Sequence, residues 1–114
     1  MKNLFLILFY FSIFLFTNAQ KVAKVAYESQ ANFSVYVVSY ESQCDLAVCK
    51  VDYESQADKP GLWYFVDYTS QAEFKVFFVD YESQADLTIF FVNYESQAGW
   101  RNKEKQHILL KNAN

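Results

Sequence analysis

A short motif, Tyr-Glu-Ser-Gln, recurs along this chain at nearly constant intervals. The copies begin at Tyr27, Tyr40, Tyr53, Tyr68, Tyr81 and Tyr94, separated by 13, 13, 15, 13 and 13 residues, and the copy at Tyr68 has Thr in place of Glu. A period this short indicates one supersecondary unit repeated, and each unit is too small to bury its apolar face alone. The units must therefore share one core.

The second half of each unit predicts a β-strand. Residues 33–38, 74–79 and 87–92 are rich in β-branched and aromatic residues and are bounded by polar clusters. With Tyr as position one, positions seven and nine point to one face, and positions ten and twelve point to the other face together with the tyrosine. Position eight is polar in three copies, so the strand starts with one solvated face and ends with both faces apolar. We expect neighbouring repeats or the tyrosine rings to cover the strand ends.

The first half of each unit predicts a wide connection. The chain has only two glycines and one proline, and it has no Asn-Gly or Asp-Gly pair of the kind that tight hairpins use. Ser and Asp bend a chain by bonding to nearby backbone groups. We expect arcs of five or six residues, or a single turn of helix.

These features predict an all-β fold, a compact wound repeat of short strands with about 13 residues per unit. Two units per lap, roughly 26 residues, would leave room for the many aromatic rings. An up-and-down β-barrel and a two-sided β-solenoid are the alternatives. The repeat is interrupted at Lys59-Pro60-Gly61 and at Gly99-Trp100. These interruptions are where function is most often added, although Trp63 and Trp100 are better explained as wedges that fill gaps than as a platform for a ligand.

Residues 1–19 predict a secretory signal peptide. Lys2 precedes a run of 13 residues, Leu4 to Phe16, that is apolar apart from Ser12, and Thr17-Asn18-Ala19 provides small residues for cleavage. The run is shorter than the roughly 20 residues of a membrane-spanning helix. We therefore expect a secreted or periplasmic protein with one domain, residues 20–114, and no membrane span after cleavage.

The charge and the cysteines exclude several kinds of site. Residues 21–100 hold five Lys against twelve Asp and Glu, which argues against a nucleic-acid partner. The basic segment 101–114 is expected to be a solvated end. Cys44 and Cys49 are too far apart on an extended strand for a disulfide and are expected to be buried thiols. A metal site needs more ligands than these two thiols and the single histidine of the chain, His107.

The sequence predicts no catalytic, cofactor-binding or metal-binding residues. Stacked rows of acidic residues could bind Ca²⁺, but a solvated acidic turn explains them better. The rows are Glu28, Glu41, Glu54, Glu82 and Glu95; Asp45, Asp58, Glu73 and Asp86; and Asp52, Asp67 and Asp80. The aromatic residues recur at strand positions, so we expect them in the core. A glycan-binding surface is the alternative.

We therefore expect a non-enzymatic, exported structural or interaction module whose protein or cell-surface glycan partner the sequence does not identify. The alternatives are a glycan- or calcium-binding surface module and an amyloid-forming matrix component. The amyloid alternative rests on residues 75–79 and 88–92, which are strong cross-β segments.

The repeat also resembles a known family. The motif Tyr-Glu-Ser-Gln-Ala-Asp, the block Gly61-Leu62-Trp63-Tyr64-Phe65-Val66-Asp67-Tyr68 and the terminal Ala98-Gly99-Trp100-Arg101-Asn102-Lys103 are similar to the septoil-knot, or 7(1)-knot, family of small, often exported bacterial proteins. The resemblance implies a compact all-β domain whose backbone forms a seven-crossing knot, although true knots are close to absent among folds. It implies no catalytic or binding residues and no known biochemical function.

Overall fold

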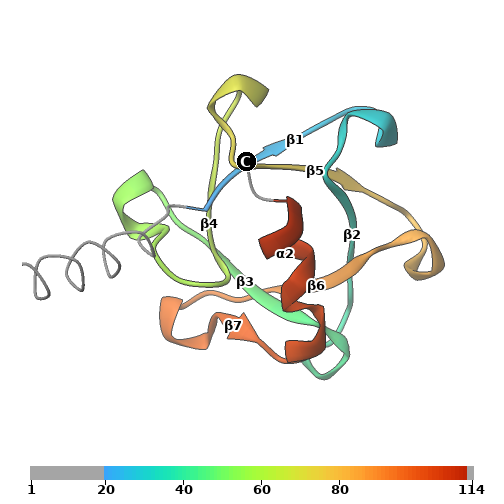
Figure 1. The fold of residues 1–114 in the computed structure, drawn as a ribbon. Coiled ribbons are helices and arrows are strands. Elements are labelled where there is room, and N and C mark those ends of the chain that lie inside the picture. Colours follow the sequence, from blue (N-terminus) through green and yellow to red (C-terminus); the bar gives the residue numbers. More distant parts are fainter. Residues whose placement is uncertain (1–19, 113–114) are drawn as a thin grey trace, which may run out of the picture.

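The computed structural model describes residues 20–112, which form a closed barrel of six parallel strands (Figure 1). The predicted signal peptide, residues 1–19, lies outside the described residues. The all-β prediction is confirmed, whereas the up-and-down barrel is excluded because all neighbouring barrel strands are parallel. The barrel strands are β1 (Lys21–Lys24), β2 (Phe33–Val37), β3 (Leu46–Lys50), β4 (Leu62–Phe65), β5 (Phe74–Phe78) and β6 (Leu87–Phe91), and β7 (Gly99–Trp100) adds an antiparallel pairing to β3.

The chain makes two interleaved laps around the barrel. The order of the strands is β4-β1-β5-β2-β6-β3, and β3 pairs again with β4 to close the ring. The first lap holds β1, β2 and β3, and each strand of the second lap lies between two strands of the first. The partners in β1–β4, β2–β5 and β3–β6 are 43 residues apart in the sequence. The predicted two units per lap are therefore wrong. There are three, because six strands are needed to enclose the apolar side chains.

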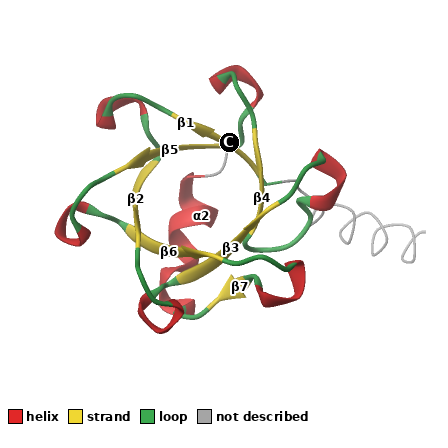
Figure 2. Cartoon of the chain, turned by 180° about the vertical axis from the view of Figure 1, so that it is seen from behind, coloured by secondary structure: helices red, strands yellow, loops and turns green. Residues whose placement is uncertain are grey.

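Each Tyr-Glu-Ser-Gln motif forms one short turn outside the barrel (Figure 2). The tyrosine is extended, and the next three residues form a single 3-10 turn closed by a backbone bond to the carbonyl of the tyrosine, at 3.0–3.1 Å. The predicted wide, glycine-poor connection is confirmed. The turns are Glu28–Gln30, Glu41–Gln43, Glu54–Gln56, Thr69–Gln71, Glu82–Gln84 and Glu95–Gln97.

The barrel interior is filled by side chains from positions seven and nine of the repeat. These residues, with Trp63 from β4, are at most 3% exposed. Each buried aliphatic or aromatic side chain contributes about 1.5–3 kcal/mol to folding. The interior residues are Val22, Phe33, Val35, Leu46, Val48, Trp63, Phe74, Val76, Leu87 and Ile89.

The outer face of the strands is covered as well. Ser34 and Ala47, at position eight, are 3% and 0% exposed, whereas Lys75 and Thr88 at the same position are half-buried. The predicted solvated face is therefore wrong for β2 and β3, and it is only partly covered in β5 and β6. The small residue after each turn explains the difference, since Cys44 packs with Ala47 and Ala57 packs with Cys49. The apolar strand ends are covered by these connections rather than by the tyrosine rings.

Acidic and amide side chains at position six join the two laps. The Asp86 side chain accepts a hydrogen bond from the backbone N–H of Ser34 at 2.9 Å, and the Asn32 side chain accepts one from the backbone N–H of Lys75 at 2.7 Å. The carboxylate of Asp45 accepts from Thr88 N–H at 3.0 Å and from the Asn102 side chain at 3.2 Å. These side chains therefore satisfy backbone donors of the other lap.

The two interruptions of the repeat meet in space. Gly61 has φ +89°, and a Cβ there would clash with the carbonyl oxygen of Ala47 and lie 2.9 Å from the nitrogen of Gly99. The two-residue insertion falls between β3 and β4, which is the step where the chain enters its second lap. Gly99 begins β7, which pairs with the start of β3 while β4 pairs with its end. The glycines permit β4 and β7 to share one edge of β3.

The C-terminal segment is docked on the barrel rather than solvated, which corrects the expectation for residues 101–114 as far as they are described. The backbone N–H groups of Arg101 and Asn102 both donate to the Asp45 carbonyl. A 3-10 turn at Lys103–Lys105 then leads into α2 (Gln106–Asn112), which lies over one end of the barrel in Figure 1. Ile108 and Leu109 are 9% and 5% exposed and belong to the core cluster, so two apolar side chains hold this end of the chain.

Replacing Gly61 with Ala is expected to lower the free energy of unfolding by roughly 2 kcal/mol or more, since the new side chain meets both a positive φ and a backbone clash. Gly99→Ala is the matched control. Its φ is +138° but no atom lies within 4 Å of the new Cβ, so a loss of roughly 1 kcal/mol is expected. Urea unfolding measures both, and equal losses would contradict the predicted clash.

Asp45→Ala is expected to lower the free energy of unfolding by about 2–3 kcal/mol, because it leaves the Thr88 N–H and the Asn102 amide without their acceptor. Asp58 stands at the same repeat position but is exposed and, among the described residues, has no hydrogen-bond partner. Asp58→Ala should therefore change the stability by less than about 0.5 kcal/mol. A loss of similar size in both variants, measured by urea unfolding, would show that the bonds of Asp45 do not join the laps.

Candidate functional site

Six nearly identical tyrosines stand on the outside of the barrel. They are 67–68% exposed, although the sequence predicts the aromatic residues to lie in the core. Their backbones share φ between −132° and −117° and ψ between 134° and 143°, so the six turns present the same local surface. Figures 1 and 2 show the turns spaced around the perimeter.

The prediction of an aromatic core is correct for one group of residues and wrong for another. Phe33, Phe74 and Trp63 are buried as expected, with Phe33 and Phe74 in edge-to-face contact at 6.0 Å between ring centroids. The tyrosines of the motif differ because each one precedes a turn that leaves the barrel wall. Position in the repeat, rather than residue type, decides which rings are buried.

The side chains of the turns take little part in holding the fold together. Within residues 20–112, only one Ser or Gln side chain of these turns takes part in a hydrogen bond. Gln56 accepts it from the backbone N–H of Tyr53, at 3.1 Å. Two of the turn glutamates form ion pairs, Glu54 with Lys21 at 3.8 Å and Glu41 with Arg101 at 3.5 Å. Such exposed pairs contribute about 0–1 kcal/mol. Most of the polar groups of the motif are therefore available to a partner.

The rows of acidic residues do not converge. The five glutamates of the first row lie on five separate turns, and Asp45 and Asp86 of the second row bond to backbone donors instead. In the part of the chain that the structure describes, no three His, Cys, Asp or Glu side chains gather as metal ligands would. The geometry gives no support to a calcium site in stacked turns.

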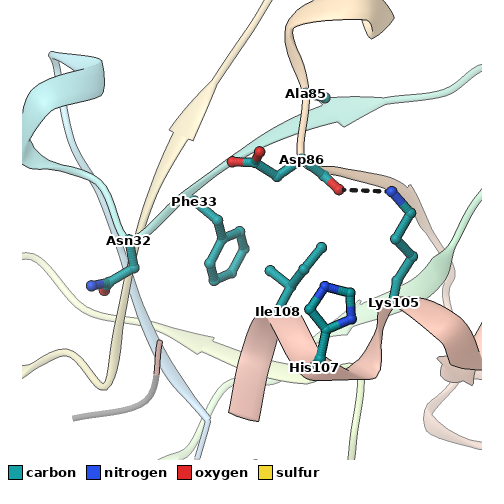
Figure 3. Close-up of a pocket in the computed structure, with 7 residues that line it drawn as sticks. All are labelled: Asn32, Phe33, Ala85, Asp86, Lys105, His107 and Ile108. Atoms are coloured by element: carbon teal, nitrogen blue, oxygen red, sulfur yellow. Dashed lines mark hydrogen bonds between the residues drawn. The ribbon is translucent and has the colours of Figure 1, made fainter. Parts of the chain in front are cut away.

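A pocket of about 400 Å³ lies where α2 meets the barrel (Figure 3). Asp86, Lys105 and His107 form its polar side, and the Lys105 ammonium donates to the Asp86 carbonyl at 3.4 Å. Phe33 and Ile108 form the apolar side and also belong to the core cluster. The sequence offered no signal for this pocket, because its residues come from different repeats and from the C-terminal segment.

The opposite end of the barrel displays aromatic rings beneath lysines. The Lys24 ammonium lies 4.8 Å from the Phe78 ring centroid, and the Lys50 ammonium lies 4.5 Å from that of Phe91 and 5.6 Å from that of Phe65. Cation–π contacts of this kind contribute about 0.5–2 kcal/mol. They close this end of the core without an additional element of secondary structure.

Both cysteines are free and buried, as predicted. Burial raises the pKa of the Cys44 thiol, and Arg101 opposes this increase only in part. Burial also raises the pKa of Cys49, and Glu95 and Asp52 add to the effect. Since the thiolate is the reactive form, neither residue has the character of a catalytic nucleophile.

Native protein is therefore expected to resist alkylation by iodoacetamide at pH 8, because the raised pKa keeps both thiols neutral and burial excludes the reagent. Mass spectrometry should show both cysteines labelled at least about tenfold faster once urea unfolds the chain. Fast labelling of the native protein would contradict the buried positions.

Comparison with known proteins identifies a family. Residues 19–101 match the family model described as the 7(1) septoil knot domain. No curated protein and no solved structure matches the chain. The match ends before α2, and no helix among the described residues is long and apolar enough to cross a membrane.

Proposed function

The chain belongs to the 7(1) septoil knot domain family, and we propose that it is an exported, non-enzymatic module that binds a repetitive polymer through its six Tyr-x-Ser-Gln turns. The observation that supports this function most directly is the exposure of all six tyrosines at 67–68%. Large aromatic rings held in the same exposed geometry six times are typical of a contact surface rather than of a scaffold.

Comparison among the six repeats supports the same proposal. Tyr, Ser and Gln are identical in every turn, whereas the buried core positions vary. In the four regular units position seven holds Phe or Leu and position nine holds Val or Ile, and in β4 Trp63 takes the corresponding place in the interior. A purely structural repeat would restrict the core positions most strongly and leave exposed positions free to vary. Here the exposed positions are the uniform ones, which indicates that they serve an interaction.

The chemistry of the turn favours a polysaccharide. A tyrosine ring offers an apolar face to a sugar ring, and Ser, Gln and Glu offer hydrogen-bond partners for hydroxyl groups. Five of the six turns carry Glu and the chain has a net charge of −3, so we expect a neutral or cationic polymer rather than an anionic one. Several weak contacts on one polymer would combine into useful affinity.

The amyloid alternative has less support. Residues 75–79 and 88–92 largely form β5 and β6, and each of these strands has a partner on both sides. Strands paired on both sides lack the free edge that cross-β stacking requires. In the folded chain these segments therefore belong to the barrel wall.

Replacing all six motif tyrosines with Ser is expected to abolish co-sedimentation with the polymer that the wild-type protein binds. The probes are insoluble chitin, cellulose and purified peptidoglycan, with heparin–agarose as the polyanionic comparison. A single Tyr→Ser change should weaken binding only a few-fold, because five turns remain. Each single change should alter the free energy of unfolding by less than about 0.5 kcal/mol.

Leu110→Ser is the matched control, since Leu110 is an apolar residue that is 78% exposed but lies on α2, away from the turns. It should leave sedimentation unchanged. Wild-type protein that sediments with none of the three polymers, or a six-Ser variant that still sediments, would overturn the proposed function. A large loss of stability in the single variants would assign the tyrosines to the fold instead.

A further inference from the structure

Trp63 holds an unused hydrogen-bond donor in the centre of the barrel. Its side chain is fully buried, and among residues 20–112 its Nε1 is the only buried side-chain nitrogen or oxygen without a hydrogen-bond partner. An indole nitrogen can only donate, and leaving a buried donor unpaired is unfavourable. Phe or Leu would fill the space without this cost, so the unpaired N–H calls for an explanation.

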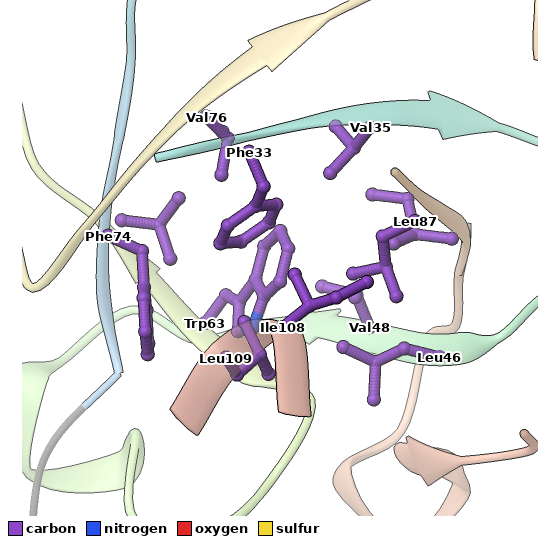
Figure 4. Close-up of a cluster of buried hydrophobic side chains, with 12 residues drawn as sticks. Phe33, Val35, Leu46, Val48, Trp63, Phe74, Val76, Leu87, Ile108 and Leu109 are labelled. Atoms are coloured by element: carbon purple, nitrogen blue, oxygen red, sulfur yellow. The ribbon is translucent and has the colours of Figure 1, made fainter. Parts of the chain in front are cut away.

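The indole lies next to the C-terminal helix. Trp63, Ile108 and Leu109 belong to one buried cluster, and Figure 4 shows the two α2 side chains beside the indole. On its other side the indole is held by Phe65, edge to face at 6.1 Å. The side of Trp63 that is covered by α2 is therefore the one that another molecule could reach if α2 moved away.

A route from solvent reaches the same place. The pocket described above is lined by Phe33 and Ile108, and both residues also belong to the cluster that contains Trp63. Figure 3 shows these two side chains facing one another in the pocket. Movement of Ile108 would join the pocket to the barrel interior beside Trp63.

The helix is weakly anchored. It has seven residues, fewer than the roughly 12–15 that an isolated helix needs for marginal stability, and Leu110 on it is 78% exposed. Its described apolar contacts with the barrel come from Ile108 and Leu109. The family match covers the barrel and ends at residue 101, so α2 lies outside the matched region.

We infer that the barrel end beneath α2 is a binding site for a small apolar molecule with one hydrogen-bond acceptor, such as a ketone or an ester, and that α2 occupies this site when the molecule is absent. The acceptor would pair with Trp63 Nε1, and the apolar part would replace the side chains of Ile108 and Leu109. This site is independent of the six turns of the proposed function.

Two compounds of similar shape test the inference on the full chain. Acetophenone carries a carbonyl acceptor and ethylbenzene does not. In ¹H–¹⁵N NMR titrations, acetophenone should shift the Trp63 indole N–H signal downfield and bind at least about tenfold more tightly than ethylbenzene, since only the ketone satisfies the donor. Trp100, the other tryptophan, provides the reference signal.

Variants of α2 and of Trp63 separate the two parts of the inference. The double variant Ile108→Asn/Leu109→Asn should bind acetophenone at least about tenfold more tightly than wild type, because the competing helix no longer fills the site. Ile108→Ala should give a smaller change in the same direction, and Leu110→Asn should give none. Trp63→Phe should remove the preference for acetophenone over ethylbenzene.

The backbone amide spectrum of each variant shows whether the barrel remains folded, and the milder Ile108→Ala variant provides the test if the double variant unfolds. Equal affinity for the two compounds in wild type would overturn the assignment of Trp63 as the recognition group. An unchanged affinity in the folded Ile108→Ala and double variants would overturn the role of α2. No response of the indole signal to acetophenone in any folded variant would overturn the site as a whole.

Discussion

Every pairing in the barrel wall joins one lap of the chain to the other. The six contacts that close the ring each combine a strand from β1–β3 with a strand from β4–β6, and no strand pairs within its own lap. A buried backbone without hydrogen bonds is strongly unfavourable, so neither lap has a stable sheet by itself. The core, the turns and the docked helix all depend on the two laps forming together.

This interdependence explains the regularity of the repeat. A strand of the second lap must match the register of two strands from the first, so an extra residue in one unit would turn its side chains to the wrong face. The two-residue insertion is tolerated where the chain passes from β3 directly to its neighbour β4. At that step Gly61 and the sharing of one β3 edge by β4 and β7 absorb the change.

Much of this fold could be predicted from the sequence because short-range patterns determine it. The strands at 33–37 and 87–91, the 3-10 turns and the buried wedge at Trp63 all follow from the spacing of apolar and polar residues within one unit. The number of units per lap could not be predicted, since it depends on which distant strands pair, and one unit is compatible with several windings. The docking of residues 101–110 was missed because two apolar side chains in a basic segment give a weak signal.

In the candidate site, too, local sequence patterns predict some features and not others. Residue type and periodicity predict burial of the motif tyrosines, but their exposure depends on where the barrel wall ends and the turn begins. The bonds of Asp45 and Asp86 to backbone groups 43 and 52 residues away were equally beyond local patterns. In contrast, the buried state of Cys44 and Cys49 followed directly from their places beside and within a predicted strand.

The interleaved laps also affect how the chain responds to force. A strand in an ordinary sheet can peel away from an edge, but here each second-lap strand is flanked by two strands of the first lap, and the ring has no open edge. The family to which the chain belongs is described as a knot. Pulling on both ends of a knotted backbone draws the crossings together instead of separating them, so the stretched chain would remain shorter than its full contour length. The chain ends are then decisive, because a knotted chain becomes a simple linear polymer only when one of its ends is withdrawn through the loops.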